Sequence, residues 1–220
     1  MKSYEAEKTE DLTNVIFLDV ETWSGDKPPI ELFEPKANLV DPLKIIKDVE
    51  EKQDKAWRAQ SLDPFLGEIF CIGLKVDDEP SFIITGTDEQ ELAECFDIEL
   101  QNYSYPKIIA HFGDQFDFHF LFIKGLQYRM RNIVNAFCGH GGGMLIDTSK
   151  IIRGTNYRAM VSLDKMTKTL TGSPAKKGIH GSDVHDLILA GKGQTVCDYC
   201  LDDVDALYKD CKVLASFGLL

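Results

Sequence analysis

The sequence lacks the long apolar segments of membrane and secreted proteins. None of its apolar runs approaches the roughly 20 residues that span a bilayer. The chain starts with MKSYEAEKTEDL, a polar and acidic stretch without the apolar core of a secretory leader. The six cysteines are scattered rather than spaced as a disulfide framework. We therefore expect a cytoplasmic protein that has no membrane partner.

The chain also lacks the ligand set of a structural zinc site. Cys197 and Cys200 form a single CxxC pair, with no second pair and no paired histidines. A redox CxxC pair should open a helix after a strand, and we do not expect that role here. The tract His140-Gly-Gly-Gly143 is similar to the oxyanion loop of some esterases, but a GxSxG nucleophile motif is missing. We interpret residues 140–143 as a flexible loop.

The sequence also has fewer basic than acidic residues. The chain has 24 Lys and Arg against 36 Asp and Glu, a formal net charge of −12, which argues at first against a polyanionic partner. The deficit is uneven, because residues 1–100 carry 10 basic and 25 acidic side chains, whereas residues 124–177 carry 10 basic and 2 acidic ones. Chance clustering on a solvated surface and a track for nucleic-acid phosphates are both open explanations of this contrast.

Hydrophobic periodicity predicts an α/β protein. Apolar runs rich in β-formers predict strands at 15–22, 69–76, 81–85 and 107–112. Helical spacing of apolar residues predicts helices at 41–60, 87–100, 115–129, 162–172, 182–191 and 195–216. Residue types that cap helix N-termini occur at Thr87, Asp114, Ser162, Ser182 and Thr195. This order predicts one mixed β-sheet flanked by α-helices, in a single domain at 13–220 after a polar tail at 1–12.

Two carboxylates lie where a buried strand is expected. Alternation within 15–22 places Val15, Phe17, Asp19 and Glu21 on one face of a strand that is otherwise apolar on both faces. An unpaired carboxylate in an apolar interior costs several kcal/mol, so a buried pair needs a compensating partner. The alternative is a frayed strand end at which both acids face water.

The last predicted helix, 195–216, adds one acid to this group. Its apolar stripe consists of Val196, Cys200, Val204, Leu207, Cys211 and Leu214. At about 100° per residue, Asp203 lies roughly 55° from the centre of the stripe and Tyr199 roughly 95°, on the same edge. Asp202 and Asp205 lie roughly 150° away and are expected to face solvent. Helical geometry therefore selects Asp203 for the interior.

A further acid, Asp117, lies in the helix predicted at 115–129, which is apolar around most of its circumference. One interpretation is that Asp117 only interacts with the helix dipole at the first turn. The other is that it joins Asp19, Glu21 and Asp203 in a set of four acids from one strand and two helices. Hard cations such as Mg²⁺ or Mn²⁺ take oxygen ligands, and two of them balance four carboxylates.

Three motifs in this order resemble the DEDDy branch of the 3′–5′ exonuclease superfamily, which has a ribonuclease H-like fold. They are Asp19-Val-Glu21-Thr22, His111-Phe-Gly-Asp-Gln-Phe-Asp117 and Tyr199-Cys-Leu-Asp-Asp203. The tracts Ser162-Leu-Asp-Lys and Gly181-Ser-Asp-Val look most similar to stand-alone relatives of the proofreading exonuclease domain of family-B DNA polymerases. Many relatives have Asn-Gly where this chain has His111-Phe-Gly, and the segment 23–67 matches no family element, so we interpret it as an insertion.

The resemblance implies a metal-dependent 3′–5′ exonuclease that releases nucleoside 5′-monophosphates from the 3′ end of single-stranded DNA. It implies that the four acids hold two Mg²⁺ or Mn²⁺ ions and that Tyr199 helps to orient or deprotonate the attacking water. It further implies contacts to the terminal nucleotide from Thr22, Trp23, His111 and Phe116, with ordinary packing as the alternative for Trp23. An RNA-directed 3′–5′ exoribonuclease, or a non-catalytic nucleic-acid-binding module with the same fold, remains an alternative.

Overall fold

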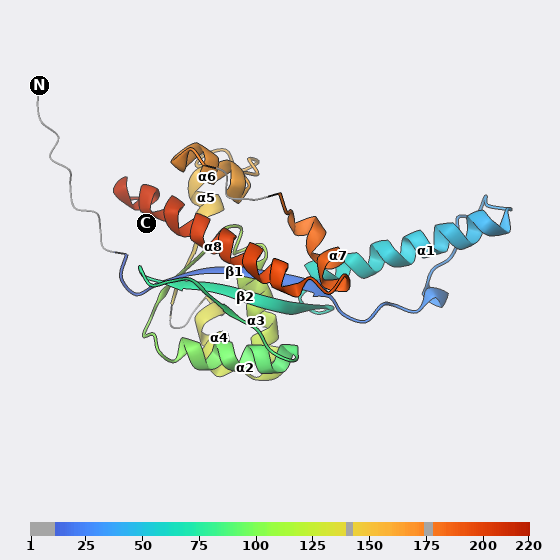
Figure 1. Cartoon of the computed structure of the whole chain (residues 1–220), viewed down its shortest axis with the longest axis horizontal. Helices are drawn as coiled ribbons and strands as arrows, with labels where there is room; N and C mark the ends of the chain where they lie inside the picture. The colour runs from blue at the N-terminus through green and yellow to red at the C-terminus, as the bar shows by residue number, and fades with distance from the viewer. Residues whose placement is uncertain (1–11, 140–142, 174–177) are drawn as a thin grey trace, which may run out of the picture.

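A computed structural model describes residues 12–139, 143–173 and 178–220 and arranges them around one five-stranded sheet (Figure 1). The sheet has the strand order β3-β2-β1-β4-β5. Its strands are β1 (Val15–Ser24), β2 (Gly67–Val76), β3 (Phe82–Ile84), β4 (Lys107–Ala110) and β5 (Met144–Asp147). β1 pairs antiparallel with β2 and parallel with β4, which in turn pairs parallel with β5. The mixed sheet expected from the sequence is confirmed. Most of the loop expected at 140–143 lies outside the described residues.

Helices cover both faces of the sheet (Figure 1). One face carries α2 (Glu89–Leu100), α3 (Asp117–Tyr128) and α4 (Arg131–Phe137). The other carries α5 (Thr148–Arg153), α6 (Leu163–Thr171), α7 (Val184–Leu189) and α8 (Gly193–Ser216). The connections contain three short 3-10 helices, η1 (Ile30–Leu32), η2 (Gln60–Leu62) and η3 (Gly181–Asp183). Within the described ranges, no helix combines the length and the apolar character that crossing a membrane requires.

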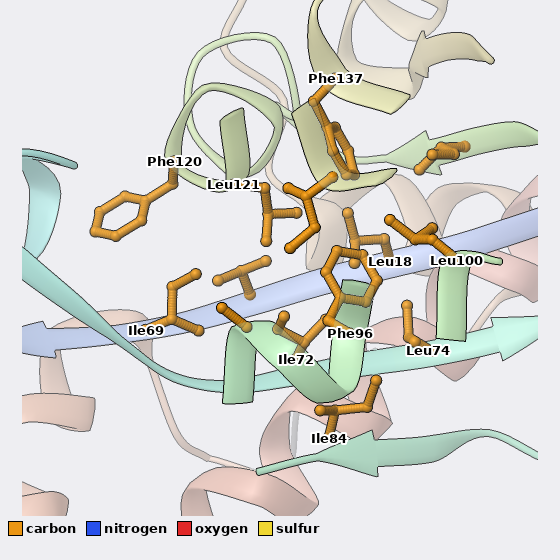
Figure 2. Close-up of a cluster of buried hydrophobic side chains, with 14 of the residues drawn as sticks. Leu18, Ile69, Ile72, Leu74, Ile84, Phe96, Leu100, Phe120, Leu121 and Phe137 are labelled. Atoms are coloured by element: carbon orange, nitrogen blue, oxygen red, sulfur yellow. The ribbon is translucent and has the colours of Figure 1, made fainter. Parts of the chain in front are cut away.

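The central strand β1 is buried on both faces, which explains its apolar sequence. Ile16, Leu18 and Val20 belong to the core under α2, α3 and α4, part of which is shown in Figure 2. Val15 and Phe17 point to the opposite face and pack in a second core with α6 and α8. Side chains alternate between the two faces of a strand, so Asp19 and Glu21, two and four residues after Phe17, lie on the same face as Phe17. Both acids therefore point toward α8.

Several elements differ from the sequence-based expectations. The elements β5, α4 and α5 were not expected from the sequence, because at 4, 7 and 6 residues they are too short for clear periodicity. Ser162 caps α6 as expected, whereas α2 is capped by Asp88 rather than Thr87. The remaining three helices begin at Asp117, Val184 and Gly193, so Asp114, Ser182 and Thr195 do not cap them.

The helix α1 (Pro42–Ala59) projects from the body as an arm (Figure 1). Asp41 caps its N-terminus by accepting a hydrogen bond from the Leu43 amide at 3.0 Å. Its base is fixed to the end of β1, because Trp57 Nε1 donates to the Gly25 carbonyl at 2.7 Å. The segment expected as an insertion, 23–67, thus runs from the last residues of β1 through this arm to the first residue of β2.

A buried acid in α8 provides a test of stability against pH. Asp210 is fully buried, and its Oδ2 accepts a hydrogen bond from Thr167 Oγ1 of α6 at 2.7 Å. Burial raises the pKa of Asp210 to about 6 from the ordinary value of 3.8. The folded state therefore binds this proton more tightly than the unfolded state, so the charged form costs stability above pH 6 and nothing below pH 4.

We expect Asp210→Asn to stabilise the protein by about 1–3 kcal/mol at pH 7.5, because it removes this buried charge and can still accept from Thr167. The gain should shrink toward zero as the pH falls below 4. Urea unfolding at several pH values measures the free energy of unfolding of both proteins. A variant that is less stable than the wild type at every pH would contradict the assignment.

Candidate metal centre

Three carboxylates from β1 and α8 converge beside the middle of the sheet. One ligand oxygen each of Asp19, Glu21 and Asp203 lies within 4.8 Å of the other two. Glu21 and Asp203 are 8% and 5% exposed, and Asp19 is partly buried. Carboxylates this close in a low-dielectric site repel one another unless they are protonated or neutralised by a cation. The two acids that share a face of β1 therefore meet the acid that helical geometry selects in α8.

Asp117, at the start of α3, approaches the same part of β1. It is 4% exposed, and its Oδ1 accepts a hydrogen bond from the Val20 amide at 3.0 Å. Because Val20 lies between the two acids of β1, this bond ties Asp117 to the strand at the carboxylate cluster. Burial is the main cause that raises the pKa of Asp117 well above its ordinary value, and the charges of Asp147 and Asp203 add to it. The structure thus brings three of the four predicted acids within 4.8 Å of one another and ties Asp117 to the strand between two of them.

Tyr199 lies one helical turn before Asp203 on α8 and is 6% exposed. Burial raises the pKa of its hydroxyl strongly, and the negative charges of Asp203, Glu21 and Asp19 raise it further. The hydroxyl therefore stays protonated at neutral pH and is available as a hydrogen-bond donor beside the carboxylates.

The acids can converge because α8 packs unusually close to β2. A Cβ atom on Gly73 of β2 would lie 2.8 Å from Cys200 Sγ and 2.9 Å from a methyl group of Val204. Such distances are shorter than van der Waals contact, so a side chain at Gly73 would push the helix outward. Cys200 also donates from its thiol to the Asp19 carbonyl at 3.4 Å. Glycine at this position therefore sets the distance between Asp203 and the acids of β1.

The loop that leads from β4 to Asp117 is held by the turn after β5. The Phe112 amide donates to Asp147 Oδ1 at 2.9 Å, and Phe112 has a φ of 63°, in the left-handed region that a bulky residue seldom adopts. His111 Nδ1 lies 2.9 Å from Thr148 Oγ1. These contacts fix a strained turn and hence the direction in which the chain enters α3.

Sequence reasoning missed Asp147, although it is 5% exposed and contributes charge to the site. Asp147 ends β5, a strand of four residues that the apolar pattern does not predict. The signal that could have found it is an aspartate directly after the short apolar pair Leu145-Ile146, followed by the polar pair Thr148-Ser149. Asp147 also caps α5, since its Oδ1 accepts from the Ser149 amide at 2.9 Å.

Two residues predicted to contact substrate extend β1 beyond the acids. Thr22 is buried, and its hydroxyl donates to the Ser61 carbonyl of η2 at 2.6 Å. Trp23 is partly buried, and its Nε1 donates to Glu68 Oε2 at 3.1 Å. Thr22 therefore holds η2 at the base of the arm, whereas Trp23 bonds to its partner in the neighbouring strand β2. Their contact with a nucleotide stays a prediction.

The other two predicted substrate contacts lie in the β4–α3 loop. Both ring nitrogens of His111 are engaged, since Nε2 lies 2.7 Å from the Val161 carbonyl in addition to the contact of Nδ1 with Thr148. Phe116 is partly buried and packs against Phe120 with ring centroids 5.5 Å apart. His111 thus links two segments of this chain, and its contact with substrate also stays a prediction.

Two further acids of α8 are less exposed than expected. Asp202 and Asp205 were expected to face solvent, but both are half-buried.

Cys197 and Cys200 lie inside α8 rather than opening a helix after a strand, and they pack with Cys71 of β2 in one apolar cluster.

The donor set of the cluster fits a hard divalent cation. Asp19, Glu21 and Asp203 offer carboxylate oxygens, which Mg²⁺ and Mn²⁺ prefer, and they converge closely enough to share an ion. A cation would also relieve the repulsion among these charges. These three acids could therefore hold a metal, with Asp117 beside them.

Comparisons with known proteins agree with this geometry. A family described as "Predicted 3'-5' exonuclease related to the exonuclease domain of PolB" matches residues 76–209, more than half of the chain, including Asp117, Tyr199 and Asp203. The structure of the family B DNA polymerase from the hyperthermophilic archaeon Pyrobaculum calidifontis is similar over 91% of this chain, with a TM-score of 0.61 and 16% identity. The match covers 24% of that polymerase. No curated protein matches the sequence. The fold is thus ribonuclease H-like, as in the exonuclease superfamily.

Proposed function

Because this chain belongs to the family of predicted 3′–5′ exonucleases related to the exonuclease domain of PolB, we propose that it is a metal-dependent 3′–5′ exonuclease of single-stranded DNA. The observation that carries the proposal is the convergence of Asp19, Glu21 and Asp203 within 4.8 Å, next to the buried Asp117 and Tyr199. Such a cluster of acids is costly to maintain in a protein that does not bind cations there.

In this proposal the four acids hold two Mg²⁺ or Mn²⁺ ions. When bound, the ions supply Lewis-acid stabilisation of the charge that develops on the attacking and leaving oxygens of the phosphodiester. The carboxylates fix where that charge is stabilised, since Asp117 is tied to Val20 and Asp203 is placed by the close packing of α8 on Gly73. Tyr199, kept protonated by its surroundings, orients the attacking water through its hydroxyl.

The proposed products are nucleoside 5′-monophosphates released one at a time from a 3′ end. An exoribonuclease with the same residues would carry out the same chemistry, and the substrate panel below separates the two. A non-catalytic module would bind nucleic acid without releasing monophosphates. The complete set of four acids and Tyr199 favours turnover over binding alone.

A 5′-labelled oligonucleotide incubated with Mg²⁺ or Mn²⁺ tests the proposal. We expect stepwise shortening from the 3′ end, faster on single-stranded DNA than on duplex DNA or on RNA. Asp117→Ala should abolish shortening, and Tyr199→Phe should slow it by about 10²–10⁴-fold while preserving metal binding, because only the water-orienting hydroxyl is lost. Full-length oligonucleotide that persists with both metals would falsify the proposal, and a preference for RNA would favour the exoribonuclease.

A further inference from the structure

We propose that the segment 148–161, which consists of α5 and the loop that follows it, is a binding platform for the single-stranded nucleic acid that leads to the scissile 3′ end. The inference rests on the proposed exonuclease function and extends it to residues outside the motifs. It depends on three features of the segment: its closed shape, its position at the end of the sheet that carries the carboxylates, and its surface chemistry.

The segment is closed because one residue binds both of its ends. His111 Nδ1 lies 2.9 Å from Thr148 Oγ1 at the beginning of the segment, and His111 Nε2 lies 2.7 Å from the Val161 carbonyl at its end. The imidazole of His111 therefore holds the two ends of the segment together, and the residues between them project from the surface.

The parallel pairing of β1 with β4 places His111 at the end of the sheet that carries the candidate metal centre. Phe17 and Ile109 are the last residues that pair between the two strands. Asp19 follows Phe17 by two residues and His111 follows Ile109 by two residues, so both lie beyond the last pair in the same direction along the sheet. The carboxyl ends of parallel β1, β4 and β5 meet at one edge of the sheet, and the segment leaves that edge directly after β5.

The surface of the segment suits a polynucleotide. Residues 148–161 contain Lys150, Arg153 and Arg158 and no acid, in a chain whose net charge is −12. Tyr157 is 78% exposed, and the guanidinium of Arg153 lies 5.9 Å from the centre of its ring. Lys150 is paired with Asp114, so Arg153 and Arg158 are the cations of the segment that can bind phosphates. An exposed aromatic ring backed by a cation is a stacking surface for bases.

We infer that Tyr157 stacks on a base upstream of the scissile bond while Arg153 and Arg158 contact phosphates. Stacking tolerates any base, so the platform would retain the strand without selecting its sequence. A duplex end offers no unpaired base to Tyr157, so the platform favours single strands. His111 is then a positioning residue that acts on the substrate through the segment.

Oligonucleotide binding by the full chain tests this inference separately from catalysis. Fluorescence anisotropy of labelled oligothymidylate and oligouridylate, with Ca²⁺ in place of Mg²⁺, measures Kd for wild type, Tyr157→Ala, Tyr157→Phe and Arg153→Ala/Arg158→Ala. Tyr105→Ala is the matched control, because Tyr105 is 79% exposed but precedes β4 at the opposite edge of the sheet. Hydrolysis of the p-nitrophenyl ester of thymidine 5′-monophosphate reports on the metal centre alone, since this substrate has no upstream nucleotide.

We expect Tyr157→Ala to raise Kd and KM for the oligonucleotide about 10-fold, Tyr157→Phe to retain affinity, and both to hydrolyse the ester like wild type. The double arginine variant should lower the slope of log affinity against log salt by about 1.4. Affinities of the segment variants equal to that of Tyr105→Ala would overturn the inference. If wild type cleaves neither substrate while the segment variants still lose affinity, the exonuclease proposal fails and the platform stands.

Discussion

Replacing Asp203 by asparagine is expected to lower kcat at least about a thousand-fold and to make the metal-free protein more stable. The first effect follows because loss of a carboxylate ligand removes several kcal/mol of metal-derived stabilisation of the transition state. The second follows because ligand oxygens of Asp203, Asp19 and Glu21 lie within 4.8 Å of one another, so neutralising Asp203 relieves repulsion among three closely spaced carboxylates. Stability and activity therefore change in opposite directions at this residue.

Thermal unfolding with and without Mn²⁺, together with oligonucleotide degradation, measures both effects. Wild type should show a rise in Tm with Mn²⁺, because ligands that bind the folded state stabilise it. Asp203→Asn should start from a higher metal-free Tm and show little further rise. Asp205→Asn is the matched control, since Asp205 is half-buried on the same helix two residues away. An Asp203→Asn variant that retains both kcat and the metal-dependent rise would exclude Asp203 as a ligand.

A buried ion pair on the opposite face of the sheet yields the largest expected loss of stability. Lys124 Nζ lies 3.0 Å from Glu89 Oε2, and both side chains are at most 5% exposed. Lys124 also donates to the Gly67 carbonyl at 2.6 Å, and Glu89 Oε1 accepts from the Ile69 amide at 2.6 Å. The pair thus fastens α2 and α3 to the first residues of β2.

We expect Lys124→Met to reduce the free energy of unfolding by about 3–5 kcal/mol, because it leaves the carboxylate of Glu89 buried without its cation. Urea unfolding measures the change. The double variant Lys124→Met/Glu89→Gln should recover much of the loss, since no unpaired charge then stays buried. Lys47→Met is the control, because Lys47 pairs with Glu51 on the exposed surface of α1 and should cost less than about 1 kcal/mol. A loss for Lys124→Met as small as that of the control would contradict the prediction.

The acids of the candidate site were identifiable from the sequence because each breaks a local pattern. Asp19 and Glu21 interrupt the apolar alternation of one strand, and Asp203 lies on the buried side of an otherwise clear helical stripe. Such departures are visible within a single element, so no knowledge of distant residues is needed. In the structure Asp19, Glu21 and Asp203 converge within 4.8 Å, and Asp117 is bound to the Val20 amide between the two acids of the strand.

Residues whose importance comes from contacts with a distant part of the sequence were not identifiable in this way. Asp147 is significant because it binds the Phe112 amide, which is 35 residues earlier in the sequence and comes close only through the parallel pairing of β4 with β5. Since β5 has four residues, its short apolar run indicates neither a strand nor the strand's neighbours. The same reason applies to Glu89 and Lys124, which look like ordinary surface charges in sequence.

The sequence by itself determined which side chains carry the proposed chemistry and which kind of cation they prefer, because residue type and local periodicity depend on neighbours in the chain. Only the tertiary structure decided how close the acids come, since that distance depends on Gly73 letting α8 approach β2. It also decided that His111 contacts both ends of the basic segment 148–161, because contacts across 37 and 50 residues follow from strand pairing and helix packing rather than from local pattern.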